Sequence, residues 1–508
     1  MSDTTTNKSQ ELFGHPKGLF YLFFAELWER FSFYGMRALL MLYMVKEIFK
    51  AFEDKDIAAA AVYASYGSLV YASTVIGGRI SDKILGMRAS IFLGGILMAI
   101  GHFVLAVEND IAFFMALAFI VVGNGFFKPN ISTFVGSLYE DGDPRKDSGF
   151  TIFYMGINIG AFASPLLCGW LGETYGWHYG FGLAGFGMLL GLLAFWNGIR
   201  TNVFGEKGMA PNETLPKVLG FDAKKAIPVL SFLTVPVIAF LLYSYKSLGK
   251  EGTWLGDQNA VNLLFKVIGV GIIIFLIKVL KEATSDERKK LIVAIVITVF
   301  MSLFWGFHEL SGSVITLFAD RNVDLAGIMN ASQTNSLNSL VIIALSIPIS
   351  LFWAFLSRKK LNPRTPVKFG LGLLFAGLSF YILSLSKHDA NAQGMVPFAY
   401  LMIMYFILSI GELFMSPVGL SKITDLSPKR IVAFMMGIWF LSSAYAFQIV
   451  GFISKKLAVE GSQEVTGGMQ TLALYTDGFE IISHYAIGAG IIALLLAPVL
   501  NKLMGNVH

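Results

Sequence analysis

This chain of 508 residues has little charge and almost no cysteine. Charged residues make up 14% of it, against roughly 25% in soluble globular domains, which argues against a soluble protein. Its single cysteine, Cys168, cannot form an intramolecular disulfide, so a disulfide-stapled fold is ruled out. The seven histidines show no metal-ligand spacing, and no Ser-His-Asp or Cys-His pattern is visible. We therefore expect no metal, no cofactor and no enzymatic chemistry.

Long apolar runs are what the chain has in abundance. Hydrophobic residues make up 55% of it, and the mean hydropathy is +0.64. Runs long enough to cross roughly 30 Å of hydrocarbon recur along the whole chain. They predict an all-α integral membrane protein with about fourteen transmembrane helices. The expected spans are 18–47, 58–81, 89–107, 111–138, 149–172, 178–199, 226–245, 260–281, 289–319, 331–357, 367–386, 396–424, 430–456 and 479–504.

The distribution of basic residues predicts the orientation of these spans. An even number of spans puts both termini on one side, and lysine and arginine gather in the loops of that side. By the positive-inside rule, both termini are expected to be cytoplasmic. The net charge of +5 fits these loops better than a nucleic-acid surface. The basic loop residues include Lys83, Arg88, Arg145, Lys146, Arg288, Lys289, Lys290, Arg358, Lys359 and Lys360.

A long polar connection after the sixth span divides the chain. It carries Gly205, Gly208, Pro211 and Pro216, residues that favour loops. If the next two spans are accessory, the others divide into six plus six, the arrangement of major facilitator transporters. We therefore predict the major facilitator fold, with two six-helix bundles and two accessory helices. The expected parts are a cytoplasmic tail over 1–17, a first bundle over 18–200, a linker over 201–225, accessory helices over 226–287 and a second bundle over 288–505.

Four charged side chains lie in the first span, at Glu26, Glu29, Arg30 and Arg37. A charge at bilayer depth costs roughly 2.5–3.5 kcal/mol on insertion scales, so each one needs a partner, a water-filled cavity or a function. Glu26, Glu29 and Arg30 share one helical face because of their spacing. They predict a polar stripe that faces the interior of a bundle.

The two halves carry complementary charges in corresponding helices. The first half supplies Arg37 and Lys128, and the second supplies Glu309 and Glu412. If the halves face each other, we expect the ion pairs Arg37–Glu309 and Lys128–Glu412, which would open and close between conformations. Fixed structural bridges are the alternative, although buried pairs stabilise little for their desolvation cost.

The loop after the second span reads Asp82-Lys-Ile-Leu-Gly86-Met-Arg88. This D-x-x-x-G-x-R pattern resembles the signature loop of the major facilitator superfamily. We expect Asp82 and Arg88 to latch neighbouring helix ends as part of a gate. A solvated turn is the alternative.

Three further motifs together resemble the proton-dependent oligopeptide transporter family. The resemblance runs from about Gly18 to Leu500, and the two inserted helices are similar to bacterial members. Glu26, Glu29, Arg30, Phe31, Tyr34 and Gly35 match its first-helix signature E-x-x-E-R-F-x-Y-Y-G. Phe153, Tyr154, Ile157, Asn158 and Gly160 match F-Y-x-x-I-N-x-G. Gly411, Glu412, Ser416 and Pro417 match a Gly-Glu-x-x-x-Ser-Pro segment.

The resemblance implies roles for the matched positions. Arg37 and Lys128 would bind the C-terminal carboxylate of a peptide, and Glu412, with Asn158 and Asn338, its N-terminal ammonium. Glu26, Glu29 and Arg30 would couple proton movement, with Glu309 and Glu412 as further carboxylates. Arg37, Glu309 and Lys128 would belong to a gate. Other side chains that would line the substrate cavity are Arg30, Tyr34, Tyr71, Tyr154, Trp305, Ser416 and Trp439.

Two departures from the family pattern affect the expected coupling. Phe33 replaces the first of two paired tyrosines, so one hydroxyl is lost. Near Ala64, the second helix lacks the histidine that animal members use in proton coupling. Coupling would then fall to carboxylates, and the sequence leaves open which of them carries the proton.

The resulting hypothesis is a proton-coupled symporter that imports di- and tripeptides across the bacterial cytoplasmic (inner) membrane by alternating access. The closest alternative is a transporter of the same fold for another solute, such as a nitrate-like anion. Glu412 argues against it, because an anion gains nothing from a buried acid. A channel or a membrane-embedded enzyme is a more distant alternative. The expected partners are peptides, protons and the lipid bilayer, with no nucleic acid.

Overall fold

The computed structural model describes residues 11–140, 142–211, 217–218, 221–246, 248, 258–415, 419–458 and 468–505. Ser416 and Pro417, which the sequence places in a motif, lie outside these residues. The helices are α1 (Lys17–Tyr43), α2 (Lys55–Ile80), α3 (Gly86–Leu105), α4 (Asp110–Ser137), α5 (Lys146–Tyr175), α6 (Trp177–Arg200), α7 (Ala223–Tyr243), α8 (Ala260–Glu282), α9 (Ser285–His308), α10 (Val314–Asn322), α11 (Ser336–Arg358), α12 (Thr365–Leu385), α13 (Phe398–Met415), α14 (Gly419–Leu426), α15 (Val432–Lys456) and α16 (Met469–Met504).

Short elements connect the helices. Turns of π- or 3₁₀-helix are η2 (Met44–Ile48), η3 (Ser81–Leu85), η4 (Glu309–Gly312), η5 (Ser332–Asn335) and η6 (Ser386–Asp389). The strands, of two residues each, are β1 (Glu11–Leu12), β2 (His15–Pro16), β3 (Lys217–Val218), β4 (Phe221–Asp222), β5 (Val323–Asp324) and β6 (Val396–Pro397). β1 pairs antiparallel with β2 and β3 with β4, whereas β5 and β6 are parallel.

Helices cover all fourteen predicted spans, which confirms an all-α membrane protein. In the described residues, 12 helical segments are long and apolar enough to cross a membrane, and one of them, Lys55–Leu105, contains both α2 and α3. With α2 and α3 counted separately, and with the more highly charged helix α1 added, these segments account for the fourteen predicted spans. Side-chain caps fix several helix starts. For example, Thr284 and Glu287 form a capping box that starts α9.

The expectation of one helix over 289–319 is wrong in detail, because the helix breaks after His308. The turn η4 and α10 follow, and the backbone at Ser313 is no longer helical. Serine and glycine form helices poorly, and they occupy Ser311, Gly312 and Ser313. The Ser313 hydroxyl donates to the Leu310 carbonyl at 3.3 Å. Thr316 donates to the Ser311 carbonyl at 2.7 Å. The break therefore leaves few backbone acceptors unsatisfied, and it puts Glu309 at the end of a helix.

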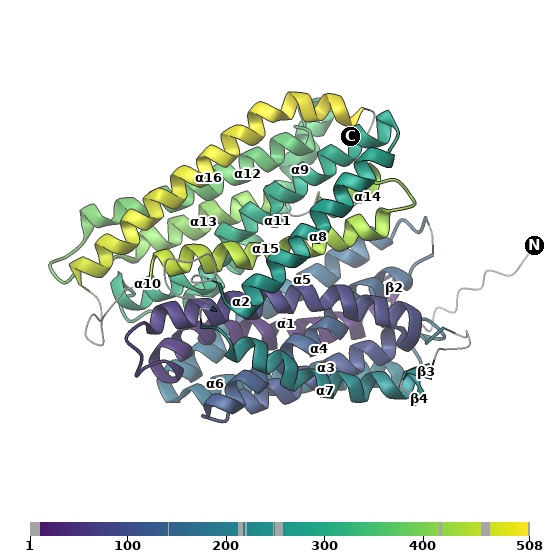
Figure 1. Ribbon diagram of the computed structural model, residues 1–508, viewed down its shortest axis with the longest axis horizontal. Coiled ribbons are helices and arrows are strands. Elements are labelled where there is room, and N and C mark those ends of the chain that lie inside the picture. Colours follow the sequence, from purple (N-terminus) through teal and green to yellow (C-terminus); the bar gives the residue numbers. More distant parts are fainter. Residues whose placement is uncertain are drawn as a thin grey trace, which may run out of the picture. The chain divides into compact units, whose positions relative to one another are not determined.

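The chain divides into two compact units, and each is described by itself. The first unit comprises Met1–Leu39 and Ala72–Phe240. Within it, α3 packs along α4 and α6, and α5 packs along α6. The second unit comprises Leu40–Tyr71 and Leu241–His508. There α12 runs between α13 and α16, α9 packs on α15, and α11 packs on α13 (Figure 1).

The boundaries of these units differ from the predicted parts at two places. Residues 40–71 belong to the second unit, where Ser68 donates to the Ala444 carbonyl at 3.0 Å. The two accessory helices separate, with α7 mostly in the first unit and α8 in the second. The predicted domain boundaries stay predictions, since compact units need not coincide with the six-helix halves of such a fold.

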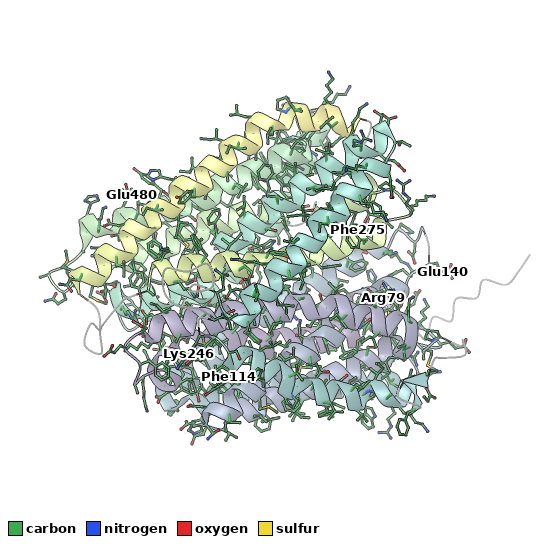
Figure 2. All side chains as sticks on the ribbon, viewed as in Figure 1. Arg79, Phe114, Glu140, Lys246, Phe275 and Glu480 are labelled. Carbon is green, nitrogen blue, oxygen red and sulfur yellow. The ribbon has the colours of Figure 1, made fainter. Side chains whose placement is uncertain are left out.

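The exposed surface of the helices is suited to lipid. Only 11% of the most apolar stretch of α8 is buried within the protein. On α8, the ring of Phe275 packs on that of Phe434 at 4.0 Å between centroids (Figure 2). Where the surface carries charge, Lys387 of η6 pairs with Glu480 of α16 at 3.3 Å.

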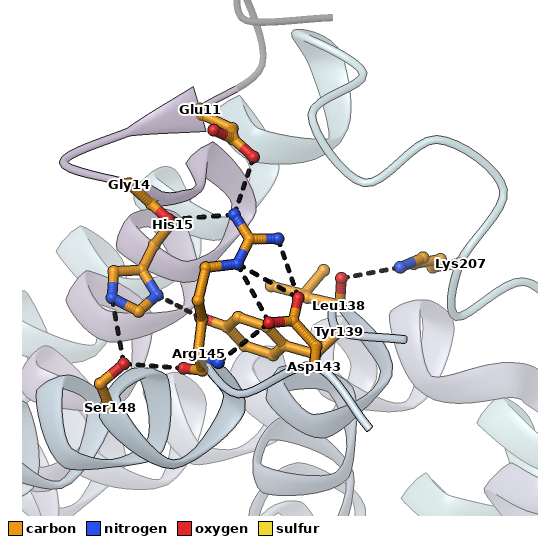
Figure 3. A network of polar contacts seen from close by, with 9 residues as sticks. All are labelled: Glu11, Gly14, His15, Leu138, Tyr139, Asp143, Arg145, Ser148 and Lys207. Carbon is orange, nitrogen blue, oxygen red and sulfur yellow. Dashed lines mark hydrogen bonds and ion pairs between the residues drawn. The ribbon is translucent and has the colours of Figure 1, made fainter. Parts of the chain in front are cut away.

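A hydrogen-bonded network fastens the N-terminal hairpin β1–β2 to the loop between α4 and α5 (Figure 3). The Arg145 guanidinium donates to Glu11 at 2.9 Å, to Asp143 at 2.8 Å and to the Gly14 carbonyl at 3.1 Å. The hydrogen bonds that the Arg145 side chain and backbone N–H donate to Asp143 lower the pKa of this carboxyl to about 2. His15 Nδ1 lies 2.9 Å from the Tyr139 hydroxyl, whose pKa burial raises to about 12.

Candidate functional site

The first polar cluster is formed by Glu26, Glu29 and Arg30 on α1, in the first unit. All three are buried, with exposed fractions of 2%, 0% and 2%. Arg30 Nη2 donates to Glu29 Oε1 at 2.7 Å, and its Nε contacts Glu29 Oε2 as well. Arg30 Nε also lies 3.3 Å from Glu26 Oε1. The predicted polar stripe is therefore present, with one guanidinium between two carboxylates.

Aromatic rings lie near the two arginines of α1. Arg30 Cζ lies 5.3 Å from the centroid of the Phe33 ring and 5.8 Å from that of Tyr34. Arg37 Cζ lies 5.7 Å from the same Tyr34 ring. These distances permit cation–π attraction. Phe33 thus lacks the hydroxyl of the family pattern but keeps the ring that contacts Arg30.

Glycines of the family motifs let α5 approach α1 closely. A Cβ at Gly160 would lie 2.4 Å from the Leu27 carbonyl oxygen and 3.1 Å from Arg30 Cβ. A Cβ at Gly35 would lie 2.6 Å from Cys168 Sγ. The distances of 2.4 and 2.6 Å are too short for a side chain. The two motifs therefore act together, because the second one supplies the helix face against which the charged turn of α1 is held.

Other predicted residues of the first unit surround this cluster. Lys128 is half-buried on α4 and close enough to Glu26 for their charges to interact. Arg37 is buried on α1. On α5, the Asn158 amide donates to the carbonyl of Tyr154 at 2.9 Å. Tyr154 is 44% exposed.

The second polar cluster lies in the second unit and is built from three helices. The Asn338 amide of α11 donates to Glu412 Oε2 of α13 at 2.9 Å and to the Ser409 hydroxyl at 2.9 Å. His308 Nε2 of α9 lies 3.0 Å from Glu412 Oε2. Ser409 in turn donates to the Tyr405 carbonyl at 2.7 Å. The predicted pairing of Glu412 with Asn338 is present, whereas Asn158 belongs to the other unit.

Aromatic side chains accompany the Glu412 cluster. The Trp305 ring lies 4.9 Å from that of His308, nearly perpendicular to it. Trp439 on α15 is buried. Tyr71, at the end of the second unit's part of α2, stacks on Phe447 at 5.7 Å. Glu309 is buried in η4, next to His308. Its expected pair with Arg37, like that of Lys128 with Glu412, joins different units and stays a prediction.

Sequence reasoning missed a third buried cluster in the second unit. The Arg321 guanidinium binds the Asp56 carboxylate bidentately at 2.6 and 2.8 Å, and it donates to the Tyr475 hydroxyl at 2.8 Å. Asp56 stands at the start of α2 and Arg321 at the end of α10. The only sequence signal is that each charge borders an apolar run. Ser409 was missed because serine is common in membrane helices.

In the motif Asp82-x-x-x-Gly86-x-Arg88, the two charged residues do not pair with each other. Among the described residues of its unit, the Asp82 side chain forms no hydrogen bond or ion pair. Arg88 instead donates to the carbonyls of Lys207 and Gly205, the first at 2.7 Å. The gating role of this pair stays a prediction. Among the described residues, no group of three or more metal-ligand side chains occurs.

Comparison with known proteins agrees with these motifs. The sequence matches the POT family over residues 88–469. It is 36% identical to a di-/tripeptide transporter of Lactococcus lactis subsp. lactis, with 99% of each chain covered. It is 32% identical to dipeptide and tripeptide permease A of Salmonella typhimurium, with 98% of this chain and 95% of that one covered.

Solved structures give the same answer. A crystal structure of the peptide transporter POT in complex with sulfate superposes with a TM-score of 0.81 at 37% identity, covering 99% of this chain and 100% of that one. A POT family transporter in complex with a thioalcohol-conjugated peptide superposes with a TM-score of 0.80 at 32% identity, covering 97% and 98%. The protein has the fold of these transporters, and it belongs to the POT family.

Proposed function

We propose that the protein is a proton-coupled symporter that imports di- and tripeptides by alternating access. Relatives of similar length are named di-/tripeptide transporters. Solved relatives hold a conjugated peptide or alafosfalin. The observation that carries the proposal is the Glu412 cluster, a buried carboxylate held by amide and imidazole groups rather than by a lysine or arginine of its own unit.

A short peptide is a zwitterion whose termini are separated by a nearly fixed distance. The first unit offers the cations Arg37 and Lys128, and the second offers Glu412. In the proposed binding mode, the cations receive the peptide carboxylate and Glu412 receives the ammonium. Tyr34, Tyr154, Trp305 and the other aromatic side chains then tolerate varied side chains, because ring faces impose little directional demand.

We assign proton coupling to the first polar cluster, formed by Glu26, Glu29 and Arg30 and called here the α1 cluster. A peptide carboxylate at Lys128 would add a negative charge beside Glu26 and Glu29. A proton on one of these acids would remove that repulsion, so peptide and proton would bind together. One proton that moves down about 100 mV and one pH unit supplies roughly 2.3 plus 1.4 kcal/mol, enough to accumulate a peptide several hundredfold. The proton would be the only coupling ion, with no bound cofactor.

The alternatives are less well supported. Anion transport does not use a buried acid such as Glu412. The relatives are named transporters and permeases, which disfavours a membrane enzyme or a channel. We propose the bacterial inner membrane as the location, with both termini in the cytoplasm, on the basis of the lysine and arginine distribution.

The test is uptake of labelled dialanine into proteoliposomes with and without an inward proton gradient. Gradient-driven accumulation that a protonophore abolishes is expected. Equilibration of dialanine that ignores the gradient would refute the coupling but not the substrate. No dialanine entry, together with uptake of nitrate, would refute the peptide assignment.

A further inference from the structure

A cavity of about 330 Å³ lies in the first unit, beside the start of α3. The turn before α3, α3 itself, the segment 208–210 and the first turns of α7 contribute to its wall. Its volume falls in the roughly 300–1,000 Å³ range of small-molecule sites. The apolar wall includes Leu85, Leu93, Met209 and Pro228, and two cations, Arg88 and Lys224, also line it.

The cavity wall is fixed by hydrogen bonds and close packing. The Arg88 backbone N–H donates to the Gly208 carbonyl at 3.0 Å. Its guanidinium holds the carbonyls of Lys207 and Gly205. A Cβ at Gly86 would lie 2.5 Å from the Ala210 nitrogen, so the segment passes directly over the bare glycine backbone. These contacts hold the segment 208–210 against the start of α3 and so fix that side of the cavity.

The two cations of the cavity retain unused binding capacity. Carbonyl contacts occupy two of the five N–H groups of the Arg88 guanidinium. The nearby Asp222 carboxylate accepts the Lys224 backbone N–H at 2.9 Å and so caps α7. Within the described part of this unit, no carboxylate pairs with the side chain of Arg88 or Lys224. An anion in the cavity would meet two cations at once.

The order of polar and apolar residues gives the orientation of a ligand. Arg88 and Lys224 stand at the starts of α3 and α7, and both helices belong to candidate membrane spans. Leu93 and Pro228 follow them by more than one turn, about 6–8 Å deeper at 1.5 Å per residue. With α3 and α7 as membrane spans, Arg88 and Lys224 lie toward the headgroups and Leu93 and Pro228 toward the hydrocarbon.

We propose that this cavity is a binding site for an anionic phospholipid. Arg88 and Lys224 hold the phosphate, and Leu93, Pro228 and Met209 contact the glycerol and the first methylenes. Basic pockets between transmembrane helices are a common form of anionic-lipid site. A free phosphate would leave the apolar wall unused, and a zwitterionic lipid would bring no net charge to two cations.

The test is native mass spectrometry of the full-length protein in a neutral detergent, titrated with dioctanoyl phosphatidylglycerol. Lys224→Gln should weaken lipid retention about fivefold, the effect of one lysine near an anionic lipid surface. Lys225→Gln is the matched control. Lys225 is the next residue of α7 and is exposed like Lys224, but it does not line the cavity. It should bind the lipid as the parent protein does.

A second variant tests the shape of the cavity without changing charge. Ala89→Phe fills the space that Ala89 lines and should reduce phosphatidylglycerol retention at least as much as Lys224→Gln. Equal losses in Lys224→Gln and Lys225→Gln would overturn the proposal, since they would indicate general surface charge. Equal retention of dioctanoyl phosphatidylcholine would overturn it too. If glycerophosphoglycerol, the headgroup without chains, competed as well as the lipid, the site would be a phosphate site instead.

Discussion

The two buried polar clusters balance charge in opposite ways. In the α1 cluster, Arg30 lies between Glu26 and Glu29 on one helix. In the Glu412 cluster, the described residues place no lysine or arginine of the same unit on the acid, and its partners Asn338 and His308 come from two other helices. The first cluster is a local arrangement of ions, whereas the second is an acid held mainly by dipoles.

This difference suggests a division of labour within the proposed transport cycle. An acid that shares a guanidinium with another acid can take up or lose a proton without any movement of helices. The acid of the Glu412 cluster is held by an amide and an imidazole, with no lysine or arginine against it in the described part of its unit, so a ligand ammonium can supply the cation. We therefore expect proton exchange at α1 and ammonium binding at Glu412.

Removing the cation of the α1 cluster should have the largest effect. Arg30→Leu leaves two buried carboxylates without their shared partner, and breaking a buried pair costs about 3–5 kcal/mol. We expect gradient-driven dialanine uptake to fall at least about a hundredfold and thermal stability to fall with it. Proteoliposome uptake and a melting curve in detergent measure the two effects.

Arg30→Lys is the matched control for this loss. It keeps the positive charge but not the bidentate contact with Glu29, so it should retain part of the uptake. Full uptake by Arg30→Leu would contradict the idea that the α1 cluster needs its own cation.

Neutralising Glu412 should have the next largest effect, and only on substrates with a free ammonium. A hydrogen bond to a charged group contributes about 1.5–3 kcal/mol, so Glu412→Gln should weaken dialanine binding roughly tenfold to a hundredfold. N-acetyl-dialanine, which lacks the ammonium, binds the parent protein and the variant alike if this account holds. Competition against a labelled dipeptide measures both. An equal loss for the two compounds would remove Glu412 from the ammonium site.

The contrast between the clusters also explains what the sequence could predict. The spacing of Glu26, Glu29 and Arg30 places them on one helical face, so their contact follows from local geometry alone. The spans were predictable for a similar reason, since an apolar run of sufficient length needs no tertiary information. The Gly-Glu-x-x-x-Ser-Pro motif located Glu412 as well, and the family resemblance implied its pairing with Asn338.

Contacts between residues on different helices could not be predicted in this way. Nothing local connects His308, Asn338 and Ser409, which meet only because α9, α11 and α13 pack together. The bidentate Asp56–Arg321 pair likewise joins residues 265 apart in the chain. The break at η4 depends on Ser313 and Thr316, whose hydroxyls satisfy the freed carbonyls in a way that hydropathy does not reveal.

A substitution at Ser409 tests how far ligand binding at Glu412 depends on the hydrogen bonds around it. Ser409→Ala removes the acceptor of one Asn338 N–H, and a neutral hydrogen bond contributes about 0.5–1.5 kcal/mol. Dialanine affinity should fall about two- to tenfold, less than in Glu412→Gln. Ser442→Ala is a suitable control, because among the described residues the Ser442 hydroxyl donates to the carbonyl of Trp439 in its own helix and to no other group. A loss in Ser409→Ala as large as that in Glu412→Gln would mean that Asn338, rather than the acid, governs binding.

Phe33→Tyr should have the smallest effect and tests whether the α1 cluster is complete without the missing hydroxyl. The Phe33 ring already contacts Arg30, and Arg30 already binds both carboxylates. In the described part of the chain, Glu26 Oε2 is the carboxylate oxygen of this cluster that still has no hydrogen-bond partner, so an added hydroxyl gains at most that one acceptor. Phe33 is buried, and an unpaired buried hydroxyl costs about 1–3 kcal/mol. We expect uptake to change less than about threefold, with a small fall in melting temperature. A tenfold gain in uptake would instead mean that the α1 cluster, like the Glu412 cluster, depends on a neutral donor.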